Sequence, residues 1–315
     1  MKKILALMMV LVLSISLVAC GGNKDNGKTP ETPPSENPET PKAGEDKFTV
    51  GFVISTQTNP FFVTLKDGAE AKAKELGVEL IVLDSQDDSA KAAANMEDLI
   101  TRGVDLILVN PTDSDAIVNS VIAANEADIP VITVDRSSNG GDVLSYIASD
   151  NIAGGKMAGE FIIEKLDGKG KVVELEGIAG TNAAIERGEG FNESIKGTDL
   201  EVVAKQTADF DRVKGLDVME NILQSQPEID AVFAHNDEMA LGALEAIKAS
   251  GRDILVVGFD ATDDAVAAVE AGDMAATVAQ QPELIGEIGV ETAVKVLKGE
   301  KVEENVPVEL RLVTK

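Results

Sequence analysis

Polar and aromatic side chains follow the short apolar runs of this chain, at positions where the strands of a parallel sheet would end. Ligands of open parallel sheets bind beyond the carboxyl ends of the strands, so we expect these side chains to converge on one ligand. Taken singly, each could be a core residue or half of a surface ion pair, but several separate loops carry the same chemistry. The candidate binding residues are Asn59, Phe61, Phe62, Asp135, Arg136, Arg187, Phe210, Asn236, Phe259, Asp260 and Gln280.

These residue types suit a neutral, polyhydroxylated ring. Carboxylates, guanidinium groups and amides exchange hydrogen bonds with neighbouring hydroxyls, and each bond to a charged partner contributes about 1.5–3 kcal/mol. Phenylalanine rings cover the C–H faces of a sugar and exclude water from those bonds. The chain has nine phenylalanines, one tyrosine and no tryptophan, so the phenylalanines of the set are a large share of its aromatic residues. The arginines and aspartates of the set balance in charge, which favours an uncharged sugar over a sugar phosphate.

The sequence contains no catalytic constellation, metal site or cofactor motif. Gly154, Gly155 and Lys156 hint at a phosphate-binding loop, but Met157 stands where that motif needs serine or threonine. No glycine-rich dinucleotide fingerprint follows a strand, and no Gly-x-Ser-x-Gly elbow is present. His235 is the only histidine, and we interpret it as a packing residue behind the site rather than a catalytic base.

An enzyme that acts on sugars is the alternative from a different functional class. It would use Asp135 and Asp260 as an acid and base pair. The neighbouring Arg136 and Arg187 argue against this, because nearby cations lower the pKa of a carboxyl group and weaken it as a general acid. We therefore expect a binding protein and not an enzyme.

The chain is strongly acidic, with 28 Lys and Arg against 55 Asp and Glu and a formal net charge of −27. Such a charge repels both phosphate backbones and anionic lipid headgroups, so no nucleic-acid partner is expected. A sugar-responsive repressor would also need a DNA-binding head before residue 48, and the segment there has no such pattern.

The N-terminal segment has the pattern of a lipoprotein signal. Two lysines precede an apolar run over residues 4–18, and small residues lead to Cys20, the only cysteine. The pattern resembles the lipobox of bacterial lipoproteins, which implies a signal peptide over residues 1–19 and a lipid on Cys20 that anchors the protein outside the cytoplasmic membrane. An uncleaved anchor and an ordinary secretory signal are the alternatives. Residues 20–47 are rich in Pro, Glu and Thr, which predicts a disordered tether.

The rest of the chain alternates β-branched runs with stretches of helical period, such as residues 60–76. This alternation is typical of βαβ units and predicts an α/β fold with parallel sheets. The strands are too many for one compact sheet, so we divide them between two sheets with the break near Ser149 and Asp150. A helix over residues 282–298 and a strand-like run over 306–313 fit either sheet on pattern alone. The expected strands are residues 48–54, 78–83, 105–109, 131–134, 144–148, 171–175, 201–205, 231–234, 254–257 and 275–278.

Longer strings around the candidate residues resemble the periplasmic sugar-binding protein family of bacterial ABC importers, and its ribose-binding members in particular. The most specific strings are residues 59–68, 110–115, 147–151, 187–191 and 236–244, and the resemblance extends from Phe48 to the end of the chain. It implies two Rossmann-like lobes joined by a three-segment hinge, the fold of type I periplasmic binding proteins. It also implies that a monomeric receptor clamps a neutral pentose, D-ribose above all, between the lobes and delivers it to a membrane permease.

The resemblance also divides the chain and the site between the two lobes. It places residues 48–149 with 281–309 in the N-terminal lobe and residues 150–280 with 310–315 in the C-terminal lobe, which assigns the helix over 282–298 to the first. The first lobe would contribute Asn59, Phe61, Phe62, Asp135 and Arg136, and the second Arg187, Phe210, Asn236, Phe259 and Asp260, with Gln280 at the hinge. The first two phenylalanines would face the other two across the sugar ring. Another neutral ligand, such as allose, galactose or a furanosyl signalling molecule, is the alternative.

Overall fold

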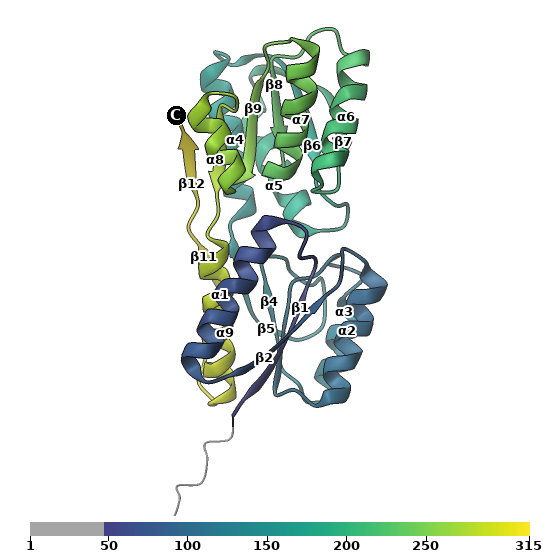
Figure 1. The fold of residues 1–315 in the computed structure, drawn as a ribbon, viewed down its shortest axis with the longest axis vertical. Helices are drawn as coiled ribbons and strands as arrows, with labels where there is room; N and C mark the ends of the chain where they lie inside the picture. Colours follow the sequence, from purple (N-terminus) through teal and green to yellow (C-terminus); the bar gives the residue numbers. More distant parts are fainter. Residues whose placement is uncertain (1–46) are drawn as a thin grey trace, which may run out of the picture. The chain divides into compact units, whose positions relative to one another are not determined.

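A computed structural model describes residues 47–315 (Figure 1). The predicted signal peptide, the predicted lipidation of Cys20 and all of the predicted tether except Lys47 lie outside the described residues. Within residues 47–315, strands and helices alternate along most of the chain, and the expected α/β fold is confirmed. None of the helices in this part of the chain is long and apolar enough to pass through a membrane.

The first sheet has six strands in the order β11-β5-β4-β3-β1-β2, and its neighbouring strands are parallel. Its strands are β1 (Thr49–Ile54), β2 (Glu79–Asp84), β3 (Leu106–Val109), β4 (Val131–Val134), β5 (Val143–Ser149) and β11 (Asn305–Val308). The helices connected with it are α1 (Pro60–Leu76), α2 (Ser89–Arg102), α3 (Val118–Glu126) and α9 (Pro282–Leu297).

The second sheet repeats this arrangement with the order β12-β10-β9-β8-β6-β7, and only its edge strand β12 is antiparallel to its neighbour. Its strands are β6 (Lys169–Glu176), β7 (Asp199–Thr207), β8 (Ala231–Ala234), β9 (Leu255–Asp260), β10 (Ala276–Ala279) and β12 (Arg311–Thr314). Its helices are α4 (Asn151–Lys165), α5 (Asn182–Ile195), α6 (Arg212–Ser225), α7 (Asp237–Ser250) and α8 (Asp263–Ala271).

The strand order changes direction at an equivalent place in each sheet. In the first sheet β1 lies between β2 and β3, and in the second β6 lies between β7 and β8. Loops that leave the carboxyl ends of such a strand pair run in opposite directions, which opens a crevice where ligands of α/β proteins bind. The topology therefore places the loop after β1 and the loop after β8, both of which carry predicted binding residues, at such crevices.

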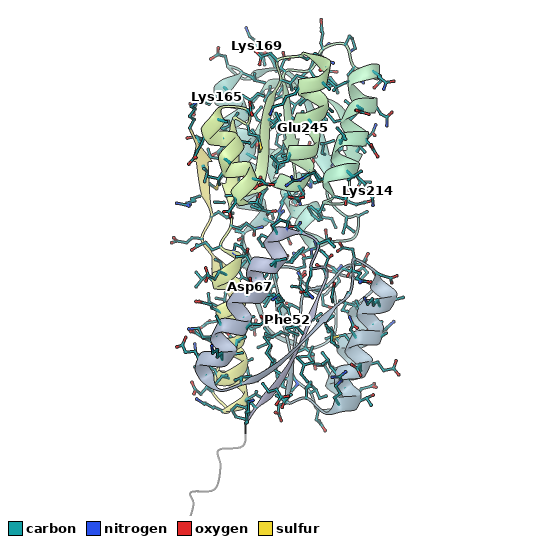
Figure 2. The ribbon with its side chains drawn as sticks, viewed as in Figure 1. Phe52, Asp67, Lys165, Lys169, Lys214 and Glu245 are labelled. Atoms are coloured by element: carbon teal, nitrogen blue, oxygen red, sulfur yellow. The ribbon has the colours of Figure 1, made fainter. Side chains whose placement is uncertain are left out.

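Helices cover both faces of each sheet, and this is why the strands are almost unbroken apolar runs. β3 and β8 are buried along their whole length. Phe52 on β1 is fully buried in the core, whereas Lys169 and Glu245 lie on the surface (Figure 2). Burial of these apolar side chains supplies the main stabilising force for a fold that has only one cysteine and therefore no internal disulfide.

The run over residues 306–313, which is strand-like throughout on its apolar pattern, is two strands in different sheets. β11 pairs with β5 in the first sheet, and β12 pairs with β10 in the second. Glu309 and Leu310 connect them and belong to neither strand. Because a short connector of this kind has no glycine or proline signal, the apolar pattern could not reveal the break. The chain passes from one sheet to the other between β5 and β6, between β10 and β11, and between β11 and β12.

Helices α1 and α9 lie side by side through close contacts at glycine (Figure 1). A Cβ atom on Gly68 would collide with the backbone of Glu283, and one on Gly286 would collide with the backbone of Leu65. Only glycine allows two helix backbones to approach so closely. This contact holds the start of α1 against the start of α9. The first turn of α1 carries the predicted binding residues Phe61 and Phe62, and Asn59 directly precedes it.

Candidate functional site

A small cavity lies among loops that follow the carboxyl ends of strands from both sheets. Its walls contain every predicted binding residue except Phe259, and they add Ala183. The lining residues are Asn59, Phe61, Phe62, Asp135, Arg136, Ala183, Arg187, Phe210, Asn236, Asp260 and Gln280.

Arg136 is buried in the wall that follows β4 of the first sheet. Its guanidinium carbon lies 5.0 Å from the ring centre of Phe62 and 5.3 Å from that of Phe210, so the cation lies near two aromatic rings. Nη1 donates to the carbonyl oxygen of Pro111 over 3.2 Å, and Nε lies 3.8 Å from Oδ2 of Asp135. These contacts compensate the guanidinium for the water it loses on burial.

Arg187 is buried in the wall formed by the second sheet. Its guanidinium carbon lies 3.9 Å from the ring centre of Phe259. Nε donates to Oδ1 of Asn151 over 2.9 Å, and Nη1 donates to the carbonyl oxygen of His235 over 2.6 Å. Nη1 also lies 3.8 Å from Oδ1 of Asp260. Contacts on several sides hold the plane of this guanidinium group in one orientation.

Phe259 is the one predicted binding residue that does not line this cavity. Successive side chains of a strand point to opposite faces, and Phe259 and Asp260 are neighbours at the end of β9. Asp260 lines the cavity, so Phe259 points into the core of the second sheet, where it is fully buried. Its ring supports Arg187, and Phe210 is left as the phenylalanine that the second sheet contributes to the lining.

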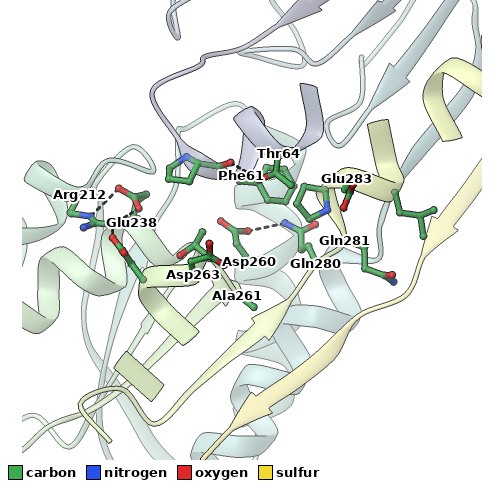
Figure 3. A pocket seen from close by; sticks show the side chains of 15 residues that line it. Phe61, Thr64, Arg212, Glu238, Asp260, Ala261, Asp263, Gln280, Gln281 and Glu283 are labelled. Atoms are coloured by element: carbon green, nitrogen blue, oxygen red, sulfur yellow. Dashed lines mark hydrogen bonds and ion pairs between the residues drawn. The ribbon is translucent and has the colours of Figure 1, made fainter. Parts of the chain in front are cut away.

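Two buried polar atoms of the wall have no hydrogen-bond partner among the described residues: Nε of Arg136 and Oε1 of Gln280. The amide nitrogen of Gln280 donates to Oδ1 of Asp260 over 2.9 Å, which leaves the side-chain oxygen able to accept a bond (Figure 3). An unsatisfied buried polar atom costs about 1–3 kcal/mol. A ligand whose groups both donate and accept, as hydroxyls do, would satisfy both atoms.

The pKa of each carboxyl group in the wall is raised overall, because burial outweighs the neighbouring arginine, and this contradicts the expectation that the arginines would lower it. Burial raises the pKa of Asp260, and Arg187 opposes the rise. Burial also raises the pKa of Asp135, and Arg136 opposes that rise. A charged ligand would leave one buried charge without a partner, so this balanced set of charges suits a neutral ligand.

Asparagine side chains hold the loops around the cavity in place. Asn59 caps the start of α1. Asn110 donates to Oδ2 of Asp135 over 3.1 Å, and Asn236 donates to the carbonyl oxygen of Phe210 over 3.2 Å. Asn110 follows β3 and was not among the predicted binding residues, although its position directly after an apolar run was a usable signal.

Loops from the two sheets also bond to one another directly. Asn182, at the start of α5, accepts a bond from the backbone N–H of Ser137 over 3.0 Å and donates to the hydroxyl of Tyr146 over 2.9 Å. The backbone N–H of Ser114 donates to the carbonyl oxygen of Gly180 over 3.1 Å. No motif marks these residues in the sequence, because each depends on a partner far away along the chain.

A groove adjoins the cavity and shares Phe61, Asp260 and Gln280 with it (Figure 3). Arg212 at its edge donates to Glu238 from Nε over 3.0 Å and from Nη2 over 2.7 Å. The three shared side chains therefore border both the cavity and a more open space.

Comparison with known proteins identifies relatives over most of the chain. Residues 50–301 match the family model described as periplasmic binding protein domain. The ribose import binding protein RbsB of Haemophilus influenzae is 60% identical over 266 residues, which are 84% of this chain and 91% of that protein. The protein of the same name from Bacillus subtilis is 49% identical over 314 residues, which are 100% of this chain and 99% of that protein.

Solved structures with the same fold contain small polyhydroxylated ligands. An ABC transporter solute binding protein from Bacillus halodurans with bound myo-inositol is 37% identical, has a TM-score of 0.82, and is matched over 86% of this chain and 96% of its own. A solute binding protein from Actinobacillus succinogenes with bound D-allose is 30% identical, has a TM-score of 0.81, and is matched over 85% of this chain and 98% of its own.

Replacing Asn182 by alanine removes the bonds to Ser137 and Tyr146. We expect the free energy of unfolding to fall by about 1–3 kcal/mol, because two groups lose a partner between the sheets. Denaturant titration followed by circular dichroism measures the change. Asn221→Ala on the exposed face of α6 is the matched control and should shift stability by less than about 0.5 kcal/mol. A loss no larger than the control's would show that these bonds add no stability.

Proposed function

Because the chain belongs to the periplasmic binding protein family, we propose that it is the extracytoplasmic sugar receptor of an ABC importer and that its ligand is D-ribose. The observation that carries the proposal is the cavity itself: a small space whose buried charges balance and whose unsatisfied atoms both need hydroxyl partners. Identities of 49% and 60% to ribose import binding proteins support the choice of ribose among neutral sugars. The receptor hands the sugar to a membrane permease.

The residues proposed to contact the sugar are those that line the cavity. Phenylalanine rings from both sheets cover its apolar faces, and the buried carboxylates, guanidinium groups and amides bond to its hydroxyls. Nε of Arg136 donates to a hydroxyl oxygen, and Oε1 of Gln280 accepts from a hydroxyl. Phe259 acts indirectly by supporting Arg187 from the core.

Binding is coupled to closure of two lobes. The first lobe comprises residues 48–149 and 281–309, the second comprises residues 150–280 and 310–315, and the three connections between the sheets form the hinge. A ligand favours the closed form only by the difference between its affinities for the two forms, and a swing from 1:99 to 99:1 takes about 5.5 kcal/mol. Hydrogen bonds from both walls to one sugar ring supply a difference of this order. The receptor acts as a monomer and needs no cofactor.

The role is binding and delivery rather than catalysis. The carboxyl groups of Asp135 and Asp260 lie beside arginines and are already engaged with side-chain amides, which suits hydrogen bonding to the hydroxyls of a sugar. Among residues 47–315, no three His, Cys, Asp or Glu side chains are grouped so that they would hold a metal ion. The named relatives are likewise transport components.

The proposal also places the protein outside the cytoplasmic membrane with a lipid on Cys20 and a tether over residues 20–47. In a cell with an outer membrane, this location is the periplasm. Support for the anchor comes from the lipobox-like segment that ends at Cys20.

Calorimetry with a panel of sugars tests the ligand. We expect D-ribose to bind, and 2-deoxyribose to bind roughly a hundredfold more weakly or worse, because a missing hydroxyl leaves buried polar groups without partners. Allose, galactose and myo-inositol belong in the panel, since similar structures hold two of these. Tight binding of one of them with no heat from ribose would contradict the assignment to ribose while leaving the receptor role intact.

Replacing Arg187 by alanine tests the site. We expect the dissociation constant for ribose to rise by a hundredfold or more, because loss of one partner of a buried pair costs about 3–5 kcal/mol. Circular dichroism checks that the variant is folded. Arg102→Ala, which removes an exposed arginine from α2, is the control and should bind as the native protein does. Binding within threefold of native in the Arg187 variant would remove this residue from the site.

Replacing Cys20 by serine tests the anchor. The thiol is the attachment point for the lipid, so the variant should leave the membrane fraction and appear in the medium or the periplasm. Mass spectrometry of the N-terminal peptide of the native protein should find the lipid on Cys20. Ser16→Ala in the same apolar run is the control and should remain with the membrane. A Cys20 variant that also stays in the membrane fraction would favour an uncleaved anchor.

A further inference from the structure

A buried imidazole lies directly behind the cavity wall. His235 follows β8 and is fully buried, as is Glu174 on the adjacent strand β6. Nε2 of His235 lies 3.1 Å from Oε1 of Glu174, and the backbone N–H of Gly177 donates to Nδ1 over 3.5 Å. An ionised carboxylate can only accept, so the ring proton belongs on Nε2, and Nδ1 is left to face the N–H of Gly177 as an acceptor. This arrangement uses the neutral form of the imidazole.

The imidazole and its carboxylate partner contact the supports of two wall residues. Nη1 of Arg187 donates to the carbonyl oxygen of His235 over 2.6 Å. The next residue, Gly188, packs so closely that a Cβ atom there would lie 2.9 Å from Oε1 of Glu174 and 3.3 Å from Cε1 of His235. The turn of α5 that carries Arg187 therefore rests on this pair.

The second support is Gly177, whose N–H bonds to the ring. A Cβ atom on Gly177 would collide with the ring of Phe210, so this phenylalanine packs directly on the Gly177 backbone. Phe210 has a left-handed backbone with φ of 59°, which makes its position dependent on what it packs against. A shift of the Gly177 backbone would therefore move the ring of Phe210 in the cavity wall.

The charged groups that act on His235 are Glu174 and Glu176 on β6 and Arg187 on α5, and Lys205 on β7 pairs with both glutamates. Burial lowers the pKa of His235, Glu174 opposes this, and Arg187 adds to it. Burial acts to raise the pKa of Glu174, but the bond with His235 and other partners lower it overall. An ionised carboxylate beside a neutral imidazole is thus the state near pH 7.

We propose that His235 is a positioning residue for the sugar site, whose neutral ring holds Arg187 and Phe210 in their binding arrangement and whose protonation weakens sugar binding. The inference rests on the function proposed above. Protonation places a second N–H on Nδ1, so that it opposes the N–H of Gly177, and it adds a cation near Arg187. Both effects act against the arrangement that binds the sugar.

Linkage fixes the direction of the pH effect. If the sugar-bound arrangement disfavours protonated His235, bound sugar must lower the pKa of His235 relative to the free protein. The affinity for the sugar is then highest above the pKa that His235 has in the sugar-free protein, and it falls as the pH drops through that value. It levels off below the pKa of the bound form. A difference of one pKa unit corresponds to a tenfold change in affinity.

Nuclear magnetic resonance can follow this residue directly because it is the only histidine of the chain. Tag-free protein is titrated between pH 4.5 and 8 with and without ribose, and circular dichroism confirms that it stays folded. We expect the pKa of the imidazole to be lower by roughly one unit with ribose bound. Equal values with and without ribose would overturn the proposal.

Calorimetry on the native protein and on His235→Gln supplies the second measurement. Glutamine can donate to Glu174 and accept from Gly177 but does not titrate. Protonation of Asp135 and Asp260 weakens binding equally in both proteins, so only the difference between them belongs to His235. Between pH 7.5 and a pH below the imidazole pKa measured with ribose bound, the native protein should lose roughly tenfold more affinity than the variant. An equal loss in both would overturn the proposal.

These outcomes are distinct from failure of the proposed function. If ribose gives no heat at pH 7.5 in either protein, the ribose assignment is wrong, and both titrations are made with the sugar from the panel that binds. If no sugar binds, the receptor function and the inference both fail. Should the His235→Gln variant not fold, the two imidazole titrations of the native protein decide alone.

Discussion

Burial of two guanidinium groups is the constraint on which this site depends. A buried cation without partners costs several kcal/mol, so every group near Arg136 and Arg187 has to compensate for lost water. For each arginine the structure supplies an aromatic ring, a backbone carbonyl and a carboxylate. The same contacts that compensate the charge also fix its orientation. The walls are therefore ordered by their own electrostatics, and a ligand does not have to organise them.

The charges are also divided evenly between the two sheets. Asp135 and Arg136 follow β4 of the first sheet, while Arg187 and Asp260 belong to the second. Each wall is electrically neutral by itself, so separating the two walls leaves neither with a net buried charge. A motion between lobes, as proposed for sugar uptake, then changes the hydration of two neutral pairs rather than of two opposite charges, which is a smaller change in free energy.

Much of the site could be predicted because its signals are local. In parallel sheets the carboxyl ends of strands meet at one edge, so residues after the apolar runs were expected together and lie together, with Phe259 as the exception. Phe259 is the exception because successive side chains at the end of β9 point to opposite faces of the sheet. Pairs such as Asn182 with Tyr146, or His235 with Glu174, could not be predicted, because each joins residues far apart in the chain and neither carries a motif. The division of the last apolar run between two sheets was likewise invisible in the apolar pattern, and only the family resemblance implied a boundary after residue 309.

Tyr146 lies at the contact between loops of the two sheets, with its hydroxyl 2.9 Å from Nδ2 of Asn182. It is the only tyrosine, and the chain has no tryptophan. At wavelengths beyond the absorption bands of the nine phenylalanines, absorption by the aromatic side chains therefore comes from one phenol at that contact. A rearrangement that changes the surroundings of this phenol alters that signal, so the molecule carries its own optical reporter of how its two halves meet.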